Sequence, residues 1–384
     1  MPEQFIEMQR ILFLLVGITL ISFGFPGHRN SPYAEHTTLA IGSPAPDFHL
    51  KGIDGKMYSL ESFKDAEVLV IVFTCDHCPT AQAYEDRIIQ LTKDYKSRGV
   101  DVVAIMPNDP KSVQLDELGY TDLGDTYAEL KVRAQEKHFN FPYLFDGEHE
   151  AAANAYGPIA TPHVFIFDKD RKLSYQGRID DVEKPTGTPR NKDTRNAIDA
   201  LLAGKPVPVQ TTKVFGCSIK WHEKEEHTAQ ADSEWATHPV TLDTIDSTGI
   251  KNLVNGNTDK LLLINVWATW CGPCVNEFPS LVDINRMYRR RDFQFISISA
   301  DDPAKKDKAL KALKSLHAAN TNYIFNTDDK YQLIDAVDSN WDGALPYTIL
   351  VEPGGKIVYS KQGPVDPQEL KTKIVDDKLI GRYY

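Results

Sequence analysis

Two short, almost entirely apolar runs stand out in the alternation of hydrophobic and polar residues. They cover residues 67–73 (EVLVIVF) and residues 261–266 (LLLINV). Short runs of β-branched and aliphatic residues are typical of strands that are buried on both faces. A Cys-x-x-Cys motif follows each run, and apolar residues at helical spacing follow each motif. The pattern therefore predicts the unit strand, dithiol, helix twice.

The same periodicities predict the other elements of each half. Asp54-Gly55 is the expected turn of a hairpin within residues 41–60. For the rest of the first half we predict strands over 100–106, 142–145, 163–167 and 173–175, and helices over 81–95, 127–137, 148–156 and 194–202. For the second half we predict strands over 293–299, 323–325, 347–351 and 357–360, and helices ending near 288 and over 304–317, 331–337 and 366–377. The two halves therefore look like an internal repeat of one plan.

This repeat sets the expected domains, residues 38–220 and residues 239–384. Residues 221–238 between them are polar and charged without a regular period, which is typical of a linker. Residues 1–34 contain an uncharged apolar run, 11–25, preceded by a basic residue. The run is shorter than the ~20 residues of a membrane-spanning helix, which favours a signal peptide over an uncleaved anchor. We expect an exported, periplasmic protein, with anchoring by this segment as the alternative.

The composition of the chain excludes some classes of protein. The 384 residues are 41% hydrophobic and 25% charged, as in an ordinary globular protein. The net charge of −11 argues against a nucleic-acid partner. The five cysteines form two Cys-x-x-Cys pairs plus Cys217, which is not the pattern of a small disulfide-stabilised scaffold.

A dithiol at the start of a helix suits redox chemistry. The attacking species is the thiolate, which the positive end of the helix dipole and the unpaired N–H groups favour. We expect Cys271 to be the exposed attacker and Cys274 the shielded resolving thiol, with Cys75 and Cys78 in the same roles. A structural zinc site uses the same spacing. That alternative predicts loss of the fold on chelation, whereas the redox interpretation predicts indifference.

Several segments resemble known families. The segment WATWCGPCVNEFP resembles the thioredoxin superfamily and is most similar to its TlpA/ResA-like thiol-disulfide oxidoreductases. The first half resembles the CxxC-containing, peroxiredoxin-like (AhpC/TSA-type redoxin) branch in the segments GSPAPDF, FTCDHCP, YGPIATPHVFIFD, LSYQGRIDD and GCSIKW. The resemblance implies an α/β protein of two tandem thioredoxin-like folds, each a central mixed β-sheet flanked by helices. It also implies disulfide exchange with protein substrates, no bound cofactor or metal, and a membrane thiol-electron donor as partner.

The resemblance assigns further site residues. It implies that Pro162 and Pro346 are cis, and that the residues before them, Thr161 and Leu345, offer backbone hydrogen bonds to a substrate peptide. Thioredoxins carry a buried acid six residues before the first cysteine, where this chain has Leu69 and Asn265.

ResA-like proteins carry a glutamate three residues after the second cysteine, and Glu277 matches it. Residues i and i+3 share a helix face, so Glu277 is expected one turn from Cys274. It is a candidate proton relay; the alternative is that it only complements the helix dipole.

The first dithiol has different neighbours. A histidine inside the motif, His77, is expected to stabilise the Cys75 thiolate and so make this pair more oxidising, whereas Asp76 would oppose it. The alternative is a solvated loop histidine. A peroxidase needs Pro and Thr or Ser at positions that hold Val68 and Val72, so we do not expect peroxidase activity.

The fifth cysteine, Cys217, leaves three alternatives open: a buried inert residue, which we take as the default, a resolving thiol for Cys75, or an intermolecular thiol. For the whole chain, the alternative to an oxidoreductase is a copper or zinc chaperone that uses the thiols as soft ligands.

Overall fold

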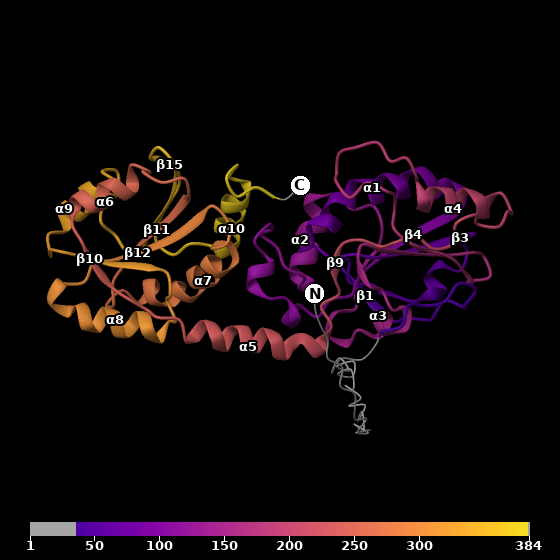
Figure 1. The fold of residues 1–384 in the computed structure, drawn as a ribbon, viewed down its shortest axis with the longest axis horizontal. Coiled ribbons are helices and arrows are strands. Elements are labelled where there is room, and N and C mark those ends of the chain that lie inside the picture. Colours follow the sequence, from indigo (N-terminus) through magenta and orange to yellow (C-terminus); the bar gives the residue numbers. More distant parts are fainter. Residues whose placement is uncertain (1–35, 383–384) are drawn as a thin grey trace, which may run out of the picture. The chain divides into compact units, whose positions relative to one another are not determined.

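The computed structural model describes residues 36–382 (Figure 1). The predicted signal segment, residues 1–34, lies outside the described part. Within that part, no helix is both long and apolar enough to cross a membrane. The described chain contains two large mixed sheets flanked by helices, as the sequence predicts.

The first sheet has its buried strand near the middle. Its order is β2-β1-β5-β4-β3-β7-β8, with β1 Leu50–Gly52, β2 Met57–Tyr58, β3 Val68–Phe73, β4 Val100–Met106, β5 Tyr143–Phe145, β7 His163–Phe167 and β8 Leu173–Gly177. Strand β3 runs parallel to β4 and antiparallel to β7. The helices of this half are α1 Pro79–Tyr95, α2 Tyr127–Glu136, α3 Ala151–Tyr156 and α4 Asp193–Leu202.

Strand β3 shows why its sequence is apolar throughout. Val68, Val70 and Val72 pack in the same core cluster as the inner face of α1, whereas the alternating Leu69 and Ile71 belong to the cluster on the other face of the sheet. Side chains of a strand alternate between faces, so a strand covered on both sides needs apolar residues at every position.

The second sheet repeats this plan. Its order is β10-β13-β12-β11-β14-β15, with β10 Asp243–Ile245, β11 Leu261–Trp267, β12 Phe293–Ser299, β13 Thr321–Phe325, β14 Tyr347–Glu352 and β15 Lys356–Gln362. The buried strand β11 runs parallel to β12 and antiparallel to β14. The helices of this half are α6 Ser247–Val254, α7 Gly272–Tyr288, α8 Lys306–Ser315, α9 Lys330–Val337 and α10 Pro367–Asp376.

Some elements were not predicted. Strand β10 and helix α6 precede β11, and β10 shows only one buried residue in three, which gives little signal. The segment expected as a linker is helical over Glu225–Ala236 (α5), with Trp235 as its one buried residue. A separate two-stranded ladder joins β6, Ala160–Thr161, to β9, Cys217–Ser218.

Candidate functional site

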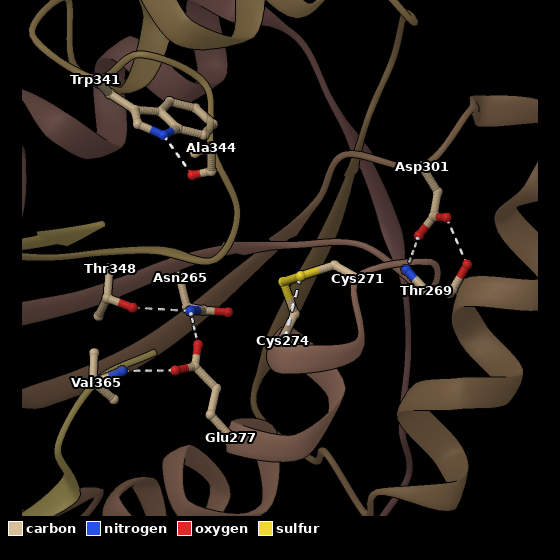
Figure 2. Close-up of a disulfide and its surroundings, with 10 residues drawn as sticks. All are labelled: Asn265, Thr269, Cys271, Cys274, Glu277, Asp301, Trp341, Ala344, Thr348 and Val365. Carbon is tan, nitrogen blue, oxygen red and sulfur yellow. Dashed lines mark hydrogen bonds between the residues drawn. A yellow bond between two sulfur atoms is a disulfide. The ribbon is translucent and has the colours of Figure 1, made fainter. Parts of the chain in front are cut away.

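The second dithiol lies where the sequence predicts it. Cys271 is the N-cap of α7 and is bonded to Cys274, and its Sγ accepts a hydrogen bond from the Cys274 N–H at 3.3 Å (Figure 2). Cys271 is 7% exposed and Cys274 0%, while the neighbouring Trp270 is 60% exposed. Cys271 is thus more exposed than Cys274, as expected, but the expectation that Cys271 is itself exposed is wrong, because both sulfur-bearing residues are buried.

Two hydrogen bonds hold the loop that precedes this dithiol. The backbone N–H and the hydroxyl of Thr269 donate to the carboxylate of Asp301, at 2.9 and 2.7 Å (Figure 2). Asp301 is buried and follows β12, so it ties the loop to the end of the neighbouring strand. This fixes the start of α7, and with it the position of Cys271.

Glu277 lies in a buried polar network. Its carboxylate accepts from the Asn265 side-chain amide at 3.1 Å and from the Val365 N–H at 2.9 Å, and the same amide donates to the Thr348 hydroxyl at 3.0 Å (Figure 2). Burial raises the pKa of Glu277, although both donors act to lower it. A group that only complemented a helix dipole would need neither burial nor these partners. The proton-relay role stays a prediction.

The loop before β14 contains the second proline. The Leu345–Pro346 peptide bond is cis, as expected. The indole N–H of Trp341 donates to the Ala344 carbonyl at 2.8 Å, and the Gly363 N–H donates to the Pro346 carbonyl at 2.9 Å. Within residues 36–382 no strand pairs with Leu345, so the predicted peptide-binding edge is free of this chain.

A cavity of about 330 Å³ lies beside this edge. Its lining includes Trp270, Phe325, Tyr331, Ile334, Trp341 and Leu345. The side chain of Tyr331 is 84% exposed. Aromatic residues therefore line this cavity, and one of them, Trp270, directly precedes Cys271 in the chain.

The first dithiol is buried, and the backbone edge beside it is covered by another strand. Cys75 and Cys78 are reduced and buried, at 2% and 0% exposure, so the expected exposed attacker is wrong for this pair. The Thr161–Pro162 bond is cis, as expected. The Cys75 sulfur lies 3.1 Å from the Thr161 hydroxyl, and the Cys78 sulfur lies 3.3 Å from the Thr161 carbonyl oxygen. The backbone edge of Thr161, the expected peptide-binding edge, is paired with Cys217.

His77 is a buried residue held by Asp125. Its Nδ1 lies 2.6 Å from the Asp125 carboxylate, which also accepts from the N–H groups of Asp76 and His77 and from the Asn108 side-chain amide. Burial alone would lower the pKa of His77, but the charge and hydrogen bond of Asp125 raise it above its usual value. The alternative of a solvated loop histidine is therefore wrong.

The charge of His77 acts on the second cysteine. Burial opposes ionisation of Cys78, but hydrogen bonds from Cys217 and Cys75, together with the charge of His77, bring its pKa well below the usual value. The pKa of Cys75 is raised by burial, by its hydrogen bond to Cys78 and by Asp125. The expectation that His77 stabilises the Cys75 thiolate is thus corrected: the stabilised thiolate is Cys78.

Asp76 was expected to oppose the stabilisation of a thiolate by His77, and this expectation is wrong. Burial and the nearby Asp125 raise its pKa well above the usual value, and the Tyr143 hydroxyl donates to it at 3.0 Å. The side chain is therefore held toward its neutral form. Asp125 and Tyr143 lie far from the motif in sequence, and no local pattern marks them.

The metal alternative has one candidate ligand set at this dithiol. Cys75, His77 and Asp125 each offer an atom within 4.8 Å of the others. His77 and Asp125 share a hydrogen bond, which accounts for their approach without an ion.

Comparisons with known proteins cover both halves. Residues 41–176 match the model of the AhpC/TSA family, and residues 236–379 match the Redoxin model. The chain is 23% identical over 201 residues to thiol-disulfide oxidoreductase ResA of Geobacillus thermodenitrificans, covering 52% of this chain and 97% of that protein. It is 30% identical over 162 residues to thiol:disulfide interchange protein CycY of Rhizobium leguminosarum bv. viciae, covering 40% and 74%.

A solved structure of an uncharacterized conserved protein from Geobacillus kaustophilus is 38% identical, with a TM-score of 0.43, over 47% of this chain and 92% of that one. The two family matches account for the two strand–dithiol–helix units, and the CycY match extends over most of its relative. The chain therefore belongs to the thioredoxin superfamily, as a thiol–disulfide oxidoreductase with two redoxin domains.

Proposed function

We propose that this protein is exported and exchanges disulfides with protein substrates through its two Cys-x-x-Cys dithiols, with the second dithiol facing the substrate. The observation that carries the proposal is the Cys271–Cys274 disulfide at the start of α7, beside an unpaired edge at Leu345. The first dithiol has the same placement, but its edge is occupied. The names of the relatives, thiol-disulfide oxidoreductase and thiol:disulfide interchange protein, support the same chemistry.

The reaction follows from the order of the two sulfurs. In the reduced form, the Cys271 thiolate attacks one sulfur of a substrate disulfide, and the other substrate sulfur leaves as a thiolate. Cys274 then attacks Cys271, so the Cys271–Cys274 disulfide closes and the substrate leaves with two thiols. Two electrons pass from the dithiol to the substrate, and a membrane thiol-electron donor restores the reduced pair.

Surrounding residues position these steps. Leu345 supplies backbone hydrogen bonds to a substrate strand, and Pro346 keeps that edge against the dithiol. Glu277 accepts the proton of Cys274 during resolution, because its raised pKa brings a buried carboxylate closer to the range in which a proton is exchanged near neutral pH. The apolar run 11–25 supports export, either as a cleaved signal or as an anchor.

Catalysed reduction of insulin by dithiothreitol tests the proposal. The Cys271→Ser variant should lose the catalysed rate, because Cys274, the other cysteine beside the open edge, has no exposed surface. The Cys75→Ser/Cys78→Ser variant is the matched control and should retain most of the rate. Full activity of Cys271→Ser would contradict the proposal, and so would an inactive wild-type protein.

A further inference from the structure

A third cysteine lies against the first dithiol. Strand β9 pairs antiparallel with β6, and the register places Cys217 opposite Thr161. The backbone N–H of Cys217 donates to the Cys78 sulfur at 3.4 Å. The two thiols also influence each other's ionisation: Cys217 acts to lower the pKa of Cys78, and Cys78 acts to raise the pKa of Cys217. Cys217 thus contacts the second cysteine of the motif rather than the first.

The segment that carries Cys217 is fixed on both sides. Gly216 has φ +146°, and a Cβ there would come within 1.9 Å of the Thr161 carbonyl oxygen, so only glycine permits this approach. After Cys217, the Lys220 N–H donates to the Asn108 side chain at 2.9 Å, and the Lys220 carbonyl accepts from the Asp109 N–H at 2.8 Å. The contact between Cys217 and Cys78 is therefore part of the fold.

The three sulfurs differ in their access to solvent. Cys75 and Cys78 are buried, whereas Cys217 is half-buried. Strand β9 occupies the edge at which an external peptide would have to align with Cys75 and Cys78. An external thiol or disulfide therefore reaches Cys217 more readily than the buried pair.

We propose that Cys217 is a third redox-active thiol, which carries the disulfide of the buried Cys75–Cys78 pair toward the surface by exchange with Cys78. The Cys217 thiolate attacks the Cys78 sulfur of the Cys75–Cys78 disulfide. The Cys78–Cys217 bond forms, the Cys75–Cys78 bond breaks, and Cys75 leaves as a thiolate that takes up the proton lost by Cys217. One disulfide and one thiol are present before and after, so no external oxidant is consumed in the step.

The protonation states of Cys78 and Cys217 determine when this exchange can take place. In the reduced protein, the hydrogen bond to Cys78 and burial raise the pKa of Cys217, which keeps it a thiol. That hydrogen bond is strongest to a Cys78 thiolate, which disappears when Cys78 enters a disulfide. Cys217 therefore gains nucleophilic character only after the buried pair has been oxidised.

The inference depends on the proposed function only for the source of the Cys75–Cys78 disulfide. The test of the inference uses oxidised glutathione alone. The inference can therefore fail while insulin reduction at Cys271 succeeds, and insulin reduction can fail while the inference holds. The full-length Cys75→Ser variant is treated with oxidised glutathione, quenched in acid, alkylated and mapped by mass spectrometry. Oxidised glutathione should react with the more accessible Cys217, and Cys78 should then displace glutathione from it, so the Cys78–Cys217 disulfide should be the dominant product.

The double variant Cys75→Ser/Cys78→Ser is the matched control, and Cys217 in it should remain joined to glutathione. A glutathione adduct on Cys217 that persists in Cys75→Ser, with Cys78 recovered as an alkylated thiol, would overturn the proposal. If Cys75→Ser does not fold by circular dichroism, the wild-type protein is mapped across a series of glutathione ratios. A Cys78–Cys217 species with alkylated Cys75 supports the proposal; its absence at every ratio overturns it.

Discussion

The side-chain amide of Asn265, in the centre of β11, donates to the carboxylate of Glu277 on α7 at 3.1 Å. Asn265, six residues before the first cysteine, is not an acid itself, but it binds the acid Glu277, which belongs to α7. The second dithiol therefore has a buried titratable neighbour in a defined place. The first dithiol has His77, Asp76 and Asp125 instead, so the two sites differ in charge.

Replacing Glu277 with Gln should make the free energy of unfolding less sensitive to pH. The raised pKa of Glu277 means that its stabilising contribution is complete below the usual value of 4.5 and is lost as the pH rises through the folded-state pKa. Gln mimics the protonated form at every pH. The difference in unfolding free energy, variant minus wild type, should therefore increase as the pH rises above 4.5, as measured by urea unfolding.

The same variant tests the proton relay. In the reduced protein, Glu277→Gln should shift the pH dependence of alkylation of Cys274 relative to wild type, because the nearby carboxylate is gone. Glu369→Gln, at an exposed position of the same domain, is the control and should leave the curve unchanged. Identical curves for Glu277→Gln and wild type would leave Glu277 with a purely structural role.

Replacing Asp125 with Asn should make the first dithiol more reducing. The variant loses the carboxylate that raises the pKa of His77, so His77 is less often charged and the Cys78 thiolate is less stabilised. Loss of one charge-assisted contact of about 1.4 kcal/mol corresponds to ~30 mV for a two-electron couple. Equilibration with glutathione in the Cys271→Ser/Cys274→Ser background measures the shift. The exposed Asp65→Asn should show none; an equal shift in both variants would rule out the His77–Asp125 explanation.

The two dithiols should have different reduction potentials, with Cys75–Cys78 the more oxidising. His77 stabilises a thiolate of the reduced first pair, whereas no charged histidine lies in the second motif. A difference of several tens of millivolts, on the order of one or two charge-assisted contacts, is expected. Full-length variants that keep only one pair, equilibrated with glutathione, give both values. Equal potentials, or a more reducing first pair, would contradict the expected order.

Replacing Gly216 with Ala should open the first dithiol. The new Cβ would collide with the Thr161 carbonyl, and a non-glycine residue held at the φ of +146° is in addition strained by roughly 1–3 kcal/mol. Detachment of β9 should speed alkylation of Cys75 and Cys78 in the reduced protein, as followed by mass spectrometry. Gly204→Ala is the control: Gly204 also has positive φ, but a Cβ there meets nothing within 4 Å. Similar rates in the two variants would mean that β9 does not shield the pair.

The strands and helices around each dithiol were predictable from the sequence because hydrophobic burial dictates their periodicity. Strand β4 was predicted with the bounds that the structure shows, and β3 and β11 to within one residue, since each is buried on both faces. Helix α5 was missed because Trp235 is its only buried residue and leaves no apolar stripe.

The closed state of the first site was not predictable in the same way. It depends on β9, a strand of two residues that pairs with β6 over a large sequence separation, and neither strand has a hydrophobic pattern of its own. The direction in which His77 acts depends on Asp125, which reaches the motif only in the folded chain. The shielding of the first dithiol and the action of His77 could not be predicted, because both depend on residues that meet only in the folded chain.

The most direct test of the proposed exchange is to trap the intermediate in the full-length Cys274→Ala variant. The reduced variant is mixed with a disulfide-containing protein, quenched in acid and analysed by mass spectrometry. Cys271 is the more exposed sulfur and retains its place at the start of α7, so mixed disulfides should accumulate on Cys271, and the Cys271→Ala variant should form few or none. Adducts that form on Cys274 in Cys271→Ala, but not on Cys271 in Cys274→Ala, would contradict the assignment of attacker and resolving thiol.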